Sequence, residues 1–236
     1  RHSGARRIGM PVPADLEDAV LDTLAASGLP EAAVRLTVSR GVADEGIGPP
    51  SGPETGRPTV VITAKPYSPE PRWYEHGIGA AVVSGRINEF AGTAGLKQLG
   101  YLESVLAQAE ARAAGADEAL RLDTLGHLAE GAISNVFLVA ENILHTPPLT
   151  CGILPGITRA TVLGLAEDAA LAVRVEPIPA AALADAEELF VTSSLREVVP
   201  VSHVDGRPVG AGRPGRVTLN LLAAYRRRIR TESRQR

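Results

Sequence analysis

Two lysines are the only side-chain amines in this sequence, since 22 of its 24 basic residues are arginine. Lys65 precedes a proline, whereas Lys97 follows a glycine-rich stretch at what we expect to be the start of a helix. The positive N-terminus of a helix, together with burial, lowers the pKa of a lysine and makes it a better nucleophile for Schiff-base formation. The sequence around Lys97 is equally consistent with a surface lysine whose methylene stem covers apolar residues.

Glu130 is the carboxylate whose sequence surroundings most strongly indicate a cationic partner. It lies between two apolar segments and leads into Ser134–Phe137. A carboxylate at the edge of a buried strand needs a cation, because burial penalises its ionised form. A protonated pyridine nitrogen would serve and so would an arginine, and the residues alone favour neither.

An anion site is indicated where the loop 149–156 meets a helix that begins near Thr158. Gly156 permits close approach of the backbone, and the first N–H groups of a helix have no partners within it. Thr192, Ser193 and Ser194 follow a predicted strand, and their hydroxyls could bind the same anion. An ordinary capped helix and an ordinary turn are the alternatives.

The elements that must position these residues divide the chain into two parts. A helix over 13–24 and strands over 34–38 and 58–63 form a small N-terminal α/β domain, which we assign to residues 1–66. The proline-rich text from Pro66 to Pro71 breaks regular structure, so we assign 67–77 to a linker and 78–236 to a large domain.

The large domain alternates strands with helices. We expect helices over 97–115, 158–172 and 217–230 and strands over 78–84, 118–122, 132–139, 142–145, 173–175, 189–192 and 199–204. The turns at 123–126 and 205–206 join neighbouring strands. This order of elements predicts a mixed fold of helices and strands, α/β (α+β).

Composition excludes several classes of function. A net charge of −3 argues against a nucleic-acid partner, and no apolar run reaches the roughly 18 residues that a membrane helix needs. The single cysteine, Cys151, excludes an internal disulfide and favours a cytoplasmic location. We expect no metal site.

Taken together, the motifs resemble the class IV aminotransferases, the fold-type IV pyridoxal-phosphate enzymes. That family includes branched-chain aminotransferases, D-amino acid aminotransferases and 4-amino-4-deoxychorismate lyase. The order and spacing of the motifs hold from about residue 58 to the C-terminus. The matching segments are Ala94–Leu106, Gly115–Leu120, Glu130–Phe137, Thr146–Pro148, Leu154–Arg159 and Val191–Glu197.

The resemblance implies a fold, a cofactor and roles. The fold would be a small N-terminal α/β domain and a larger β-barrel-like domain with helices, with pyridoxal phosphate between them. Lys97 would hold the cofactor as a Schiff base and move the substrate proton, while Glu130 would pair with the pyridinium nitrogen. The phosphate would be bound by Ile157, Thr158 and Ser194, and Tyr101, one residue closer to Lys97 than in branched-chain members, would bind the ring phenolate.

The sequence departs from the family pattern at two places. The N-terminal strand pair and the phosphate-binding arginine that members carry are not recognisable, and we expect them to be missing from this chain; Arg6 does not replace that arginine. The carboxylate-binding motifs of some members are also absent after Arg40. Arg35 and Arg40 are therefore the candidates for binding the substrate carboxylate.

The resemblance implies an aminotransferase that moves an amino group between an amino acid and a 2-oxo acid, as a homodimer. The alternative is 4-amino-4-deoxychorismate lyase, because the text around Lys97 is similar to that of the lyases, whereas Thr192–Pro200 is similar to that of the transaminases. A non-catalytic binding domain is a third hypothesis, and the presence of both Lys97 and Glu130 argues against it.

Overall fold

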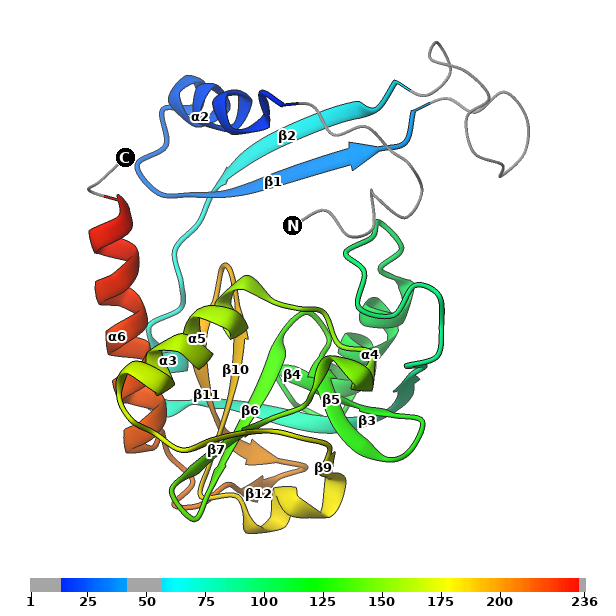
Figure 1. Cartoon of the computed structure of the whole chain (residues 1–236), viewed down its shortest axis with the longest axis vertical. Coiled ribbons are helices and arrows are strands. Elements are labelled where there is room, and N and C mark those ends of the chain that lie inside the picture. The colour runs from blue at the N-terminus through cyan, green and yellow to red at the C-terminus, as the bar shows by residue number, and fades with distance from the viewer. Residues whose placement is uncertain (1–13, 42–56, 234–236) are drawn as a thin grey trace. The chain divides into compact units, whose positions relative to one another are not determined.

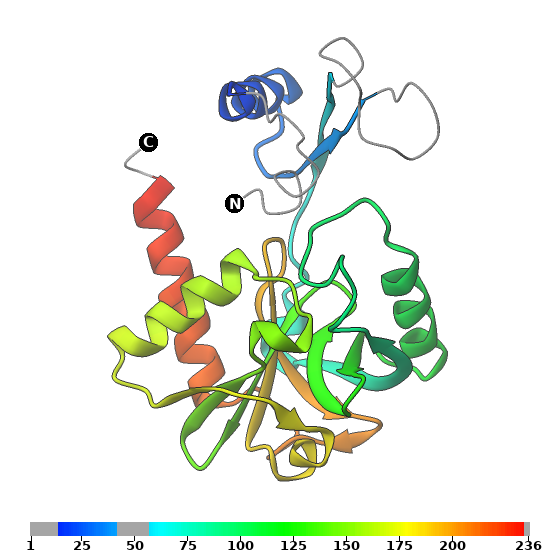
Figure 2. The same cartoon turned by 45° about the vertical axis from the view of Figure 1, so that its right-hand side comes forward.

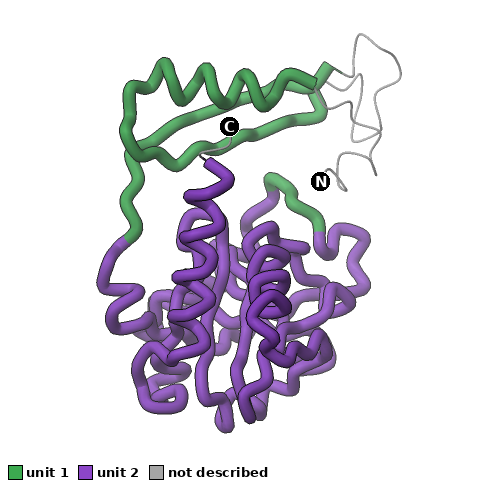
Figure 3. Tube along the Cα trace, turned by 60° about the vertical axis from the view of Figure 1, so that its left-hand side comes forward, with its two compact units in different colours: residues 1–69, 96–99 green, residues 70–95, 100–236 purple. Residues whose placement is uncertain are grey.

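The computed structural model describes residues 14–41 and 57–233. The chain forms two compact units, coloured separately in Figure 3. Unit 1 comprises residues 1–69 together with 96–99, and unit 2 comprises residues 70–95 together with 100–236.

Unit 1 contains helix α2 (Leu16–Ser27) and an antiparallel pair of strands, β1 (Ala32–Ser39) and β2 (Thr59–Pro66). The helix ends at Gly28, whose left-handed backbone (φ 62°) lets its N–H reach the Ala25 carbonyl. The three elements confirm the predicted helix and both predicted strands.

The centre of unit 2 is a closed barrel (Figure 1). Neighbouring strands around it run in the order β6, β10, β11, β3, β4 and β5, and a β5–β6 pairing at Glu130↔Asn135 closes the ring. The β11–β3 and β3–β4 pairs are parallel, and the other neighbours are antiparallel. The strands of unit 2 are β3 (Ile78–Ile87), β4 (Glu118–Asp123), β5 (His127–Gly131), β6 (Asn135–Ala140), β7 (Ile143–Thr146), β8 (Val173–Val175), β9 (Ile178–Pro179), β10 (Glu188–Ser193), β11 (Glu197–Val204) and β12 (Arg207–Pro208).

Side chains point alternately into the barrel and out of it along each strand, so they form an inner core and an outer layer. On β6, Val136 and Leu138 belong to the inner core, while Phe137 and Val139 pack with helices α5 (Ile157–Asp168) and α6 (Arg216–Ser233). Phe137 stacks on Phe190 of β10, its partner in the ladder, with ring centroids 4.9 Å apart. Helices α5 and α6 lie together on one side of the barrel, and α4 lies on the other (Figures 1 and 2). The helices are α3 (Arg72–His76), α4 (Leu102–Ala113), α5 (Ile157–Asp168) and α6 (Arg216–Ser233), with short 3-10 turns η1 (Leu149–Cys151) and η2 (Ala180–Asp185).

The predicted helix over 97–115 is wrong at its beginning. Helix α4 begins at Leu102, and Lys97 lies in irregular backbone after Gly95, which has φ 69°. Glycine stabilises helices poorly, so the text around Gly95 and Gly100 does not extend the helix backwards. Lys97 therefore does not occupy a helix N-terminus, and its nucleophilicity cannot be ascribed to a helix dipole.

The segment between the turn at 123–126 and residue 135 also differs from the prediction. Residues 127–131 form β5, a strand that the prediction omitted, and residues 132–134 form a bend rather than the start of β6. The sequence of β5 is short and mixes charged and apolar residues, so it shows no clear alternation of apolar and polar positions. Glu130 consequently lies within a strand.

Helix α4 packs on the barrel through its smallest side chains. Ala107 and Ala111 are buried against Ala81, Val83 and Ala119 of β3 and β4. The larger apolar residues of the helix point away from the barrel, with Leu102 69%, Val105 60% and Leu106 57% exposed. Within the residues that the structure describes, no helix is long and apolar enough to cross a membrane.

Candidate active site

Glu130 on β5 is held at both carboxylate oxygens. Arg121 Nη2 on β4 donates to Oε1 at 2.8 Å, and the backbone N–H of Leu154 donates to Oε2 at 2.9 Å. The side chains of Glu130 and Arg121 are 14% and 11% exposed. The cation that the sequence required for this carboxylate is thus supplied at least in part by an arginine. Because a carboxylate has about four lone-pair sites, it still has acceptor capacity for a ligand.

The loop after η1 is fixed to the barrel by Asn135, the first residue of β6. Asn135 Nδ2 donates to the Leu154 carbonyl at 2.8 Å, and Asn135 is 4% exposed. Gly156 lies so close to Asn135 Oδ1 that a Cβ atom at this position would overlap it. This close approach brings the loop and the beginning of α5 against the strand next to Glu130.

The N-terminus of α5 has the properties of an anion site. Gly156 is its N-cap and makes no side-chain cap, which leaves the N–H groups of Ile157 and Thr158 without a cap from that side chain. Thr158 is 3% exposed. Arg159 is also buried, and its guanidinium donates to the neutral oxygens of Thr146 and Pro147. Burial lowers the pKa of Arg159, and its positive charge adds to that of the helix end.

Thr192, at the end of β10, lies beside Asn135 in the β6–β10 ladder. Its hydroxyl is buried without a hydrogen-bond partner among the described residues. Buried hydroxyls are nearly always satisfied, so an orphan of this kind indicates a polar ligand or water nearby. Ser194 lies in the exposed turn that follows β10, and the Ser193 hydroxyl accepts a bond from the Arg196 N–H at 3.3 Å.

These residues together fit the phosphate and the ring of pyridoxal phosphate. A helix N-terminus beside a buried arginine and an unsatisfied hydroxyl suits a phosphate. The buried Glu130 carboxylate of β5, which contacts the loop before α5 at Leu154, suits a pyridinium nitrogen. The structure therefore brings Glu130, Ile157 and Thr158 into one region of unit 2, joined by Asn135 and residues 154–156.

The other predicted site residues lie elsewhere in the chain. Lys97 belongs to the segment 96–99 that groups with unit 1, as does Arg35 on β1 and Arg40 just after it. Tyr101 belongs to unit 2 and is the N-cap residue of α4, where its carbonyl accepts the Val105 N–H. Arg6 lies outside the described residues.

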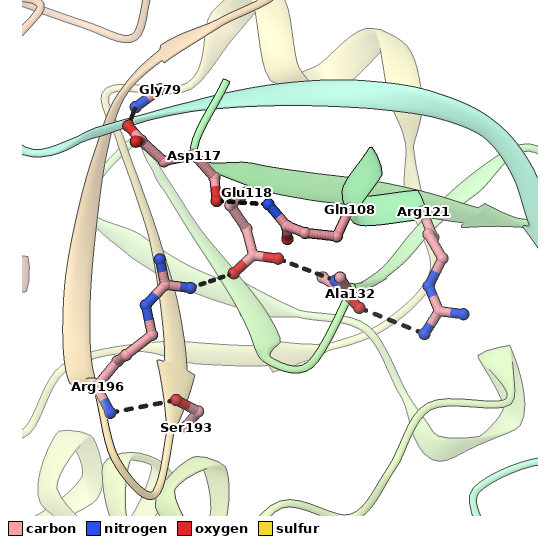
Figure 4. Close-up of polar contacts among 9 residues, drawn as sticks. Gly79, Gln108, Asp117, Glu118, Arg121, Ala132, Ser193 and Arg196 are labelled. Atoms are coloured by element: carbon pink, nitrogen blue, oxygen red, sulfur yellow. Dashed lines mark hydrogen bonds and ion pairs between the residues drawn. The ribbon is translucent and has the colours of Figure 1, made fainter. Parts of the chain in front are cut away.

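The sequence prediction missed a second buried ion pair, between Glu118 and Arg196 (Figure 4). Glu118 is fully buried, and its Oε2 lies 2.6 Å from Arg196 Nη1. Its other oxygen accepts the Ala132 N–H at 3.0 Å, so it holds the bend that follows Glu130. Arg196 also lies over the ring of Trp73, with its guanidinium carbon 4.8 Å from the ring centroid. The spacing of Glu118 and Arg196, 78 residues apart, gave no signal of this contact.

Two further titratable groups are perturbed at the turn between β4 and β5. Burial alone would raise the pKa of Asp123, but hydrogen bonds from the backbone and ring of His127 and from Cys151 bring it below its usual value. Burial, with the nearby Asp123 carboxylate, raises the pKa of the Cys151 thiol to about 12. Cys151 is thus an unreactive thiol at neutral pH. No group of three His, Cys, Asp or Glu residues in the described ranges could hold a metal ion.

Comparison with known proteins confirms the resemblance that the motifs predicted. Residues 2–204 match the family model described as amino-transferase class IV. The branched-chain-amino-acid aminotransferase of Escherichia coli K12 is 34% identical over 231 residues, which cover 95% of this chain and 74% of that enzyme.

Solved structures agree in fold. A crystal structure of the Escherichia coli branched-chain amino acid aminotransferase matches with a TM-score of 0.88 at 34% identity, over 94% of this chain and 74% of that chain. The T.th. branched-chain amino acid aminotransferase, crystallised with pyridoxamine 5′-phosphate, has a TM-score of 0.85 at 31% identity, over 94% and 73% of the two chains. The predicted α/β fold with a barrel-like large domain is confirmed, and the chain belongs to the class IV aminotransferases, a family of pyridoxal-phosphate-dependent enzymes.

Proposed function

We propose that this aminotransferase binds pyridoxal phosphate through Lys97, Glu130 and the N-terminus of α5, and transfers amino groups between branched-chain amino acids and 2-oxo acids. The observation that carries the proposal is the contact of the buried Glu130 carboxylate with Leu154, in the loop that leads directly into α5. Residues 154–156 thereby connect the Glu130 carboxylate, which would bind the ring, to the N-terminus of α5, which would bind the phosphate. We further propose the domain division at 1–66, 67–77 and 78–236.

Lys97 would form the covalent link to the cofactor, because its amine can condense with an aldehyde with loss of water. Once the substrate amine displaces it, Lys97 is the base that takes the proton from the substrate Cα and returns it to the cofactor side. When bound, pyridoxal phosphate supplies an electron sink for the pair of electrons left on that carbon. Lys65, on β2 before Pro66, has neither role.

The residues of unit 2 would bind and orient the group. Glu130 accepts a hydrogen bond from the ring nitrogen and keeps it positively charged, while Tyr101 donates to the ring phenolate. The N–H groups of Ile157 and Thr158 donate to the phosphate. The hydroxyls of Thr158 and Ser194 complete that site. The unsatisfied Thr192 hydroxyl and the buried Arg159 charge support an anion in this region.

The substrate assignment rests on the relatives. Those described above are named branched-chain aminotransferases, so we assign branched-chain amino acids and their 2-oxo acids to this chain. Arg35 and Arg40 of unit 1 are the candidates for binding the substrate carboxylate, because an arginine can bind both its oxygens.

We also propose a homodimer located in the cytoplasm. The apolar face of α4, formed by Leu102, Val105 and Leu106, is exposed and would be covered in a dimer. The single cysteine, Cys151, is buried and free, which suits a reducing compartment.

A spectroscopic experiment tests the function. The protein mixed with pyridoxal phosphate should develop a visible absorbance band that borohydride abolishes, Lys97→Ala should lack the band and Lys65→Ala should retain it. Adding leucine should convert the band to the pyridoxamine spectrum, and adding 2-oxoglutarate should restore it. Absence of the band in the unmodified protein would contradict the proposal. Release of pyruvate from 4-amino-4-deoxychorismate without an amino acceptor would identify the lyase instead.

A further inference from the structure

We propose that Arg121 is a positioning residue, which keeps the Glu130 carboxylate ionised and thereby keeps the shared proton on the ring nitrogen of the cofactor. This inference rests on the proposed function, since it assumes that Glu130 binds that nitrogen. It extends the proposed function to a residue of β4 that does not itself touch the cofactor in the proposed arrangement.

The contact between the two side chains is close and sheltered from water. Arg121 and Glu130 face each other in the β4–β5 ladder, and Nη2 lies 2.8 Å from Oε1. The same Nη2 atom donates to the Gly131 carbonyl at 3.3 Å (Figure 4). Charge-assisted hydrogen bonds of this length between sheltered groups are about twice as strong as neutral ones.

The two other carboxylates of β4 have partners of their own. Glu118, on the same strand, pairs with Arg196 of the turn after β10. Asp123, at the end of that strand, pairs with His127 at the start of β5. Arg121, in contrast, contacts Glu130 directly.

The location of the proton follows from the charge on Glu130. With Arg121 on Oε1 and the Leu154 N–H on Oε2, the negative form is stabilised twice, and the proton between Glu130 and the ring nitrogen stays on nitrogen. Without Arg121, burial favours the neutral acid, and the proton moves to the carboxylate. The ring then loses its positive charge.

The Lys97 Schiff base reports the charge on the ring. A positive charge nearby disfavours protonation of the imine nitrogen, so the imine loses its proton at a higher pH when the ring is neutral. The pH midpoint of the visible absorbance change therefore measures ring protonation separately from turnover. We would measure it in the cofactor-loaded protein and in the variants Arg121→Met, Arg121→Lys, Glu130→Gln and the double variant Arg121→Met with Glu130→Gln.

Glu130→Gln should raise the midpoint by about one pH unit or more, because glutamine cannot stabilise a ring cation. Arg121→Met should raise it in the same direction by a comparable amount. Arg121→Lys should restore a midpoint close to that of the unmodified protein, since the charge is kept. The double variant should match Glu130→Gln alone, because Arg121 acts through Glu130.

The inference is wrong if Arg121→Met leaves the midpoint unchanged while Glu130→Gln shifts it, or if the two shifts add in the double variant. Arg121→Gln replaces Arg121→Met should the latter not fold, with the same expected shift. A protein that forms no Schiff base at all would contradict the proposed function instead. If Glu130→Gln leaves the pH midpoint of the Schiff base unchanged, Glu130 does not contact the ring nitrogen, and this inference fails with that contact.

Discussion

Arg196 and Glu118 form an ion pair that joins two segments 78 residues apart, with Nη1 2.6 Å from Oε2 and the carboxylate fully buried. Through the Ala132 N–H on its other oxygen, Glu118 holds the bend next to Glu130. One carboxylate thus connects the turn after β10 to the loop beside the candidate cofactor site. The stability of this connection can be measured without any ligand.

Arg196→Met should destabilise the folded protein by about 3 kcal/mol, because it leaves a buried carboxylate without its cation. Urea denaturation of the cofactor-free protein measures the effect. The double variant Arg196→Met with Glu118→Gln should recover part of the loss, since glutamine carries no charge. Equal stability of Arg196→Met and the unmodified protein would show that the pair contributes nothing.

Gly156→Ala should weaken the binding of pyridoxal phosphate by at least about tenfold, because the new Cβ would overlap Asn135 Oδ1. Asn135 cannot easily yield, since it is buried and donates to the Leu154 carbonyl. Gly164→Ala, in the interior of α5, is the matched control because its Cβ would meet open space. The control should keep the affinity and gain up to about 1 kcal/mol of stability. Fluorescence titration of the cofactor-free proteins compares the two, and equal affinities would contradict the proposed phosphate site.

The lowered pKa of Asp123 predicts a pH dependence of stability. A carboxyl group whose pKa is lower in the folded state stabilises that state above its ordinary value of 3.8, and this contribution is lost as the pH falls below that value. Asp123→Asn should therefore cost more at pH 7 than at pH 3, by up to about 1 kcal/mol, because the contribution is only partly lost at pH 3. Urea midpoints at the two pH values measure the difference. The exposed Glu103→Gln serves as a control and should show little change at either pH.

Val105→Glu should convert a dimer into a monomer, because it places a charge in the exposed apolar face of α4. Glu103→Lys changes a charge on the same helix without altering the three apolar residues, and should leave the assembly intact. Light scattering during gel filtration gives the mass of each protein. A dimer that survives Val105→Glu would show that this face is not the interface.

Much of the fold could be predicted from local patterns. The strands that become β3 and β11 consist largely of apolar residues, and the predicted helix over 13–24 overlaps α2. Local patterns failed where tertiary packing decides. Leu102, Val105 and Leu106 are the large apolar residues of α4, yet Ala107 and Ala111 face the barrel because small side chains allow the helix to approach closely.

The candidate site was predictable only in part. Glu130, Thr158 and Gly156 could be identified because each type suits its expected ligand at its position. Arg121 could not, because its pairing with Glu130 depends on the register of β4 and β5, and β5 itself lacked a recognisable pattern. The contact of Arg196 with Glu118 was even less predictable from the sequence, because it exists only once the barrel has closed.

The place of β10 and β11 in the barrel constrains how the protein is made. These strands lie between β6 and β3, so the ring cannot close before residues 188–204 have left the ribosome. Until then the nascent chain carries two unpaired strand edges, on β6 and on β3, and the Glu118 carboxylate awaits Arg196. Such edges bind other chains readily. The interval between the synthesis of β6 and that of β11 is therefore a period in which the nascent chain is open to aggregation.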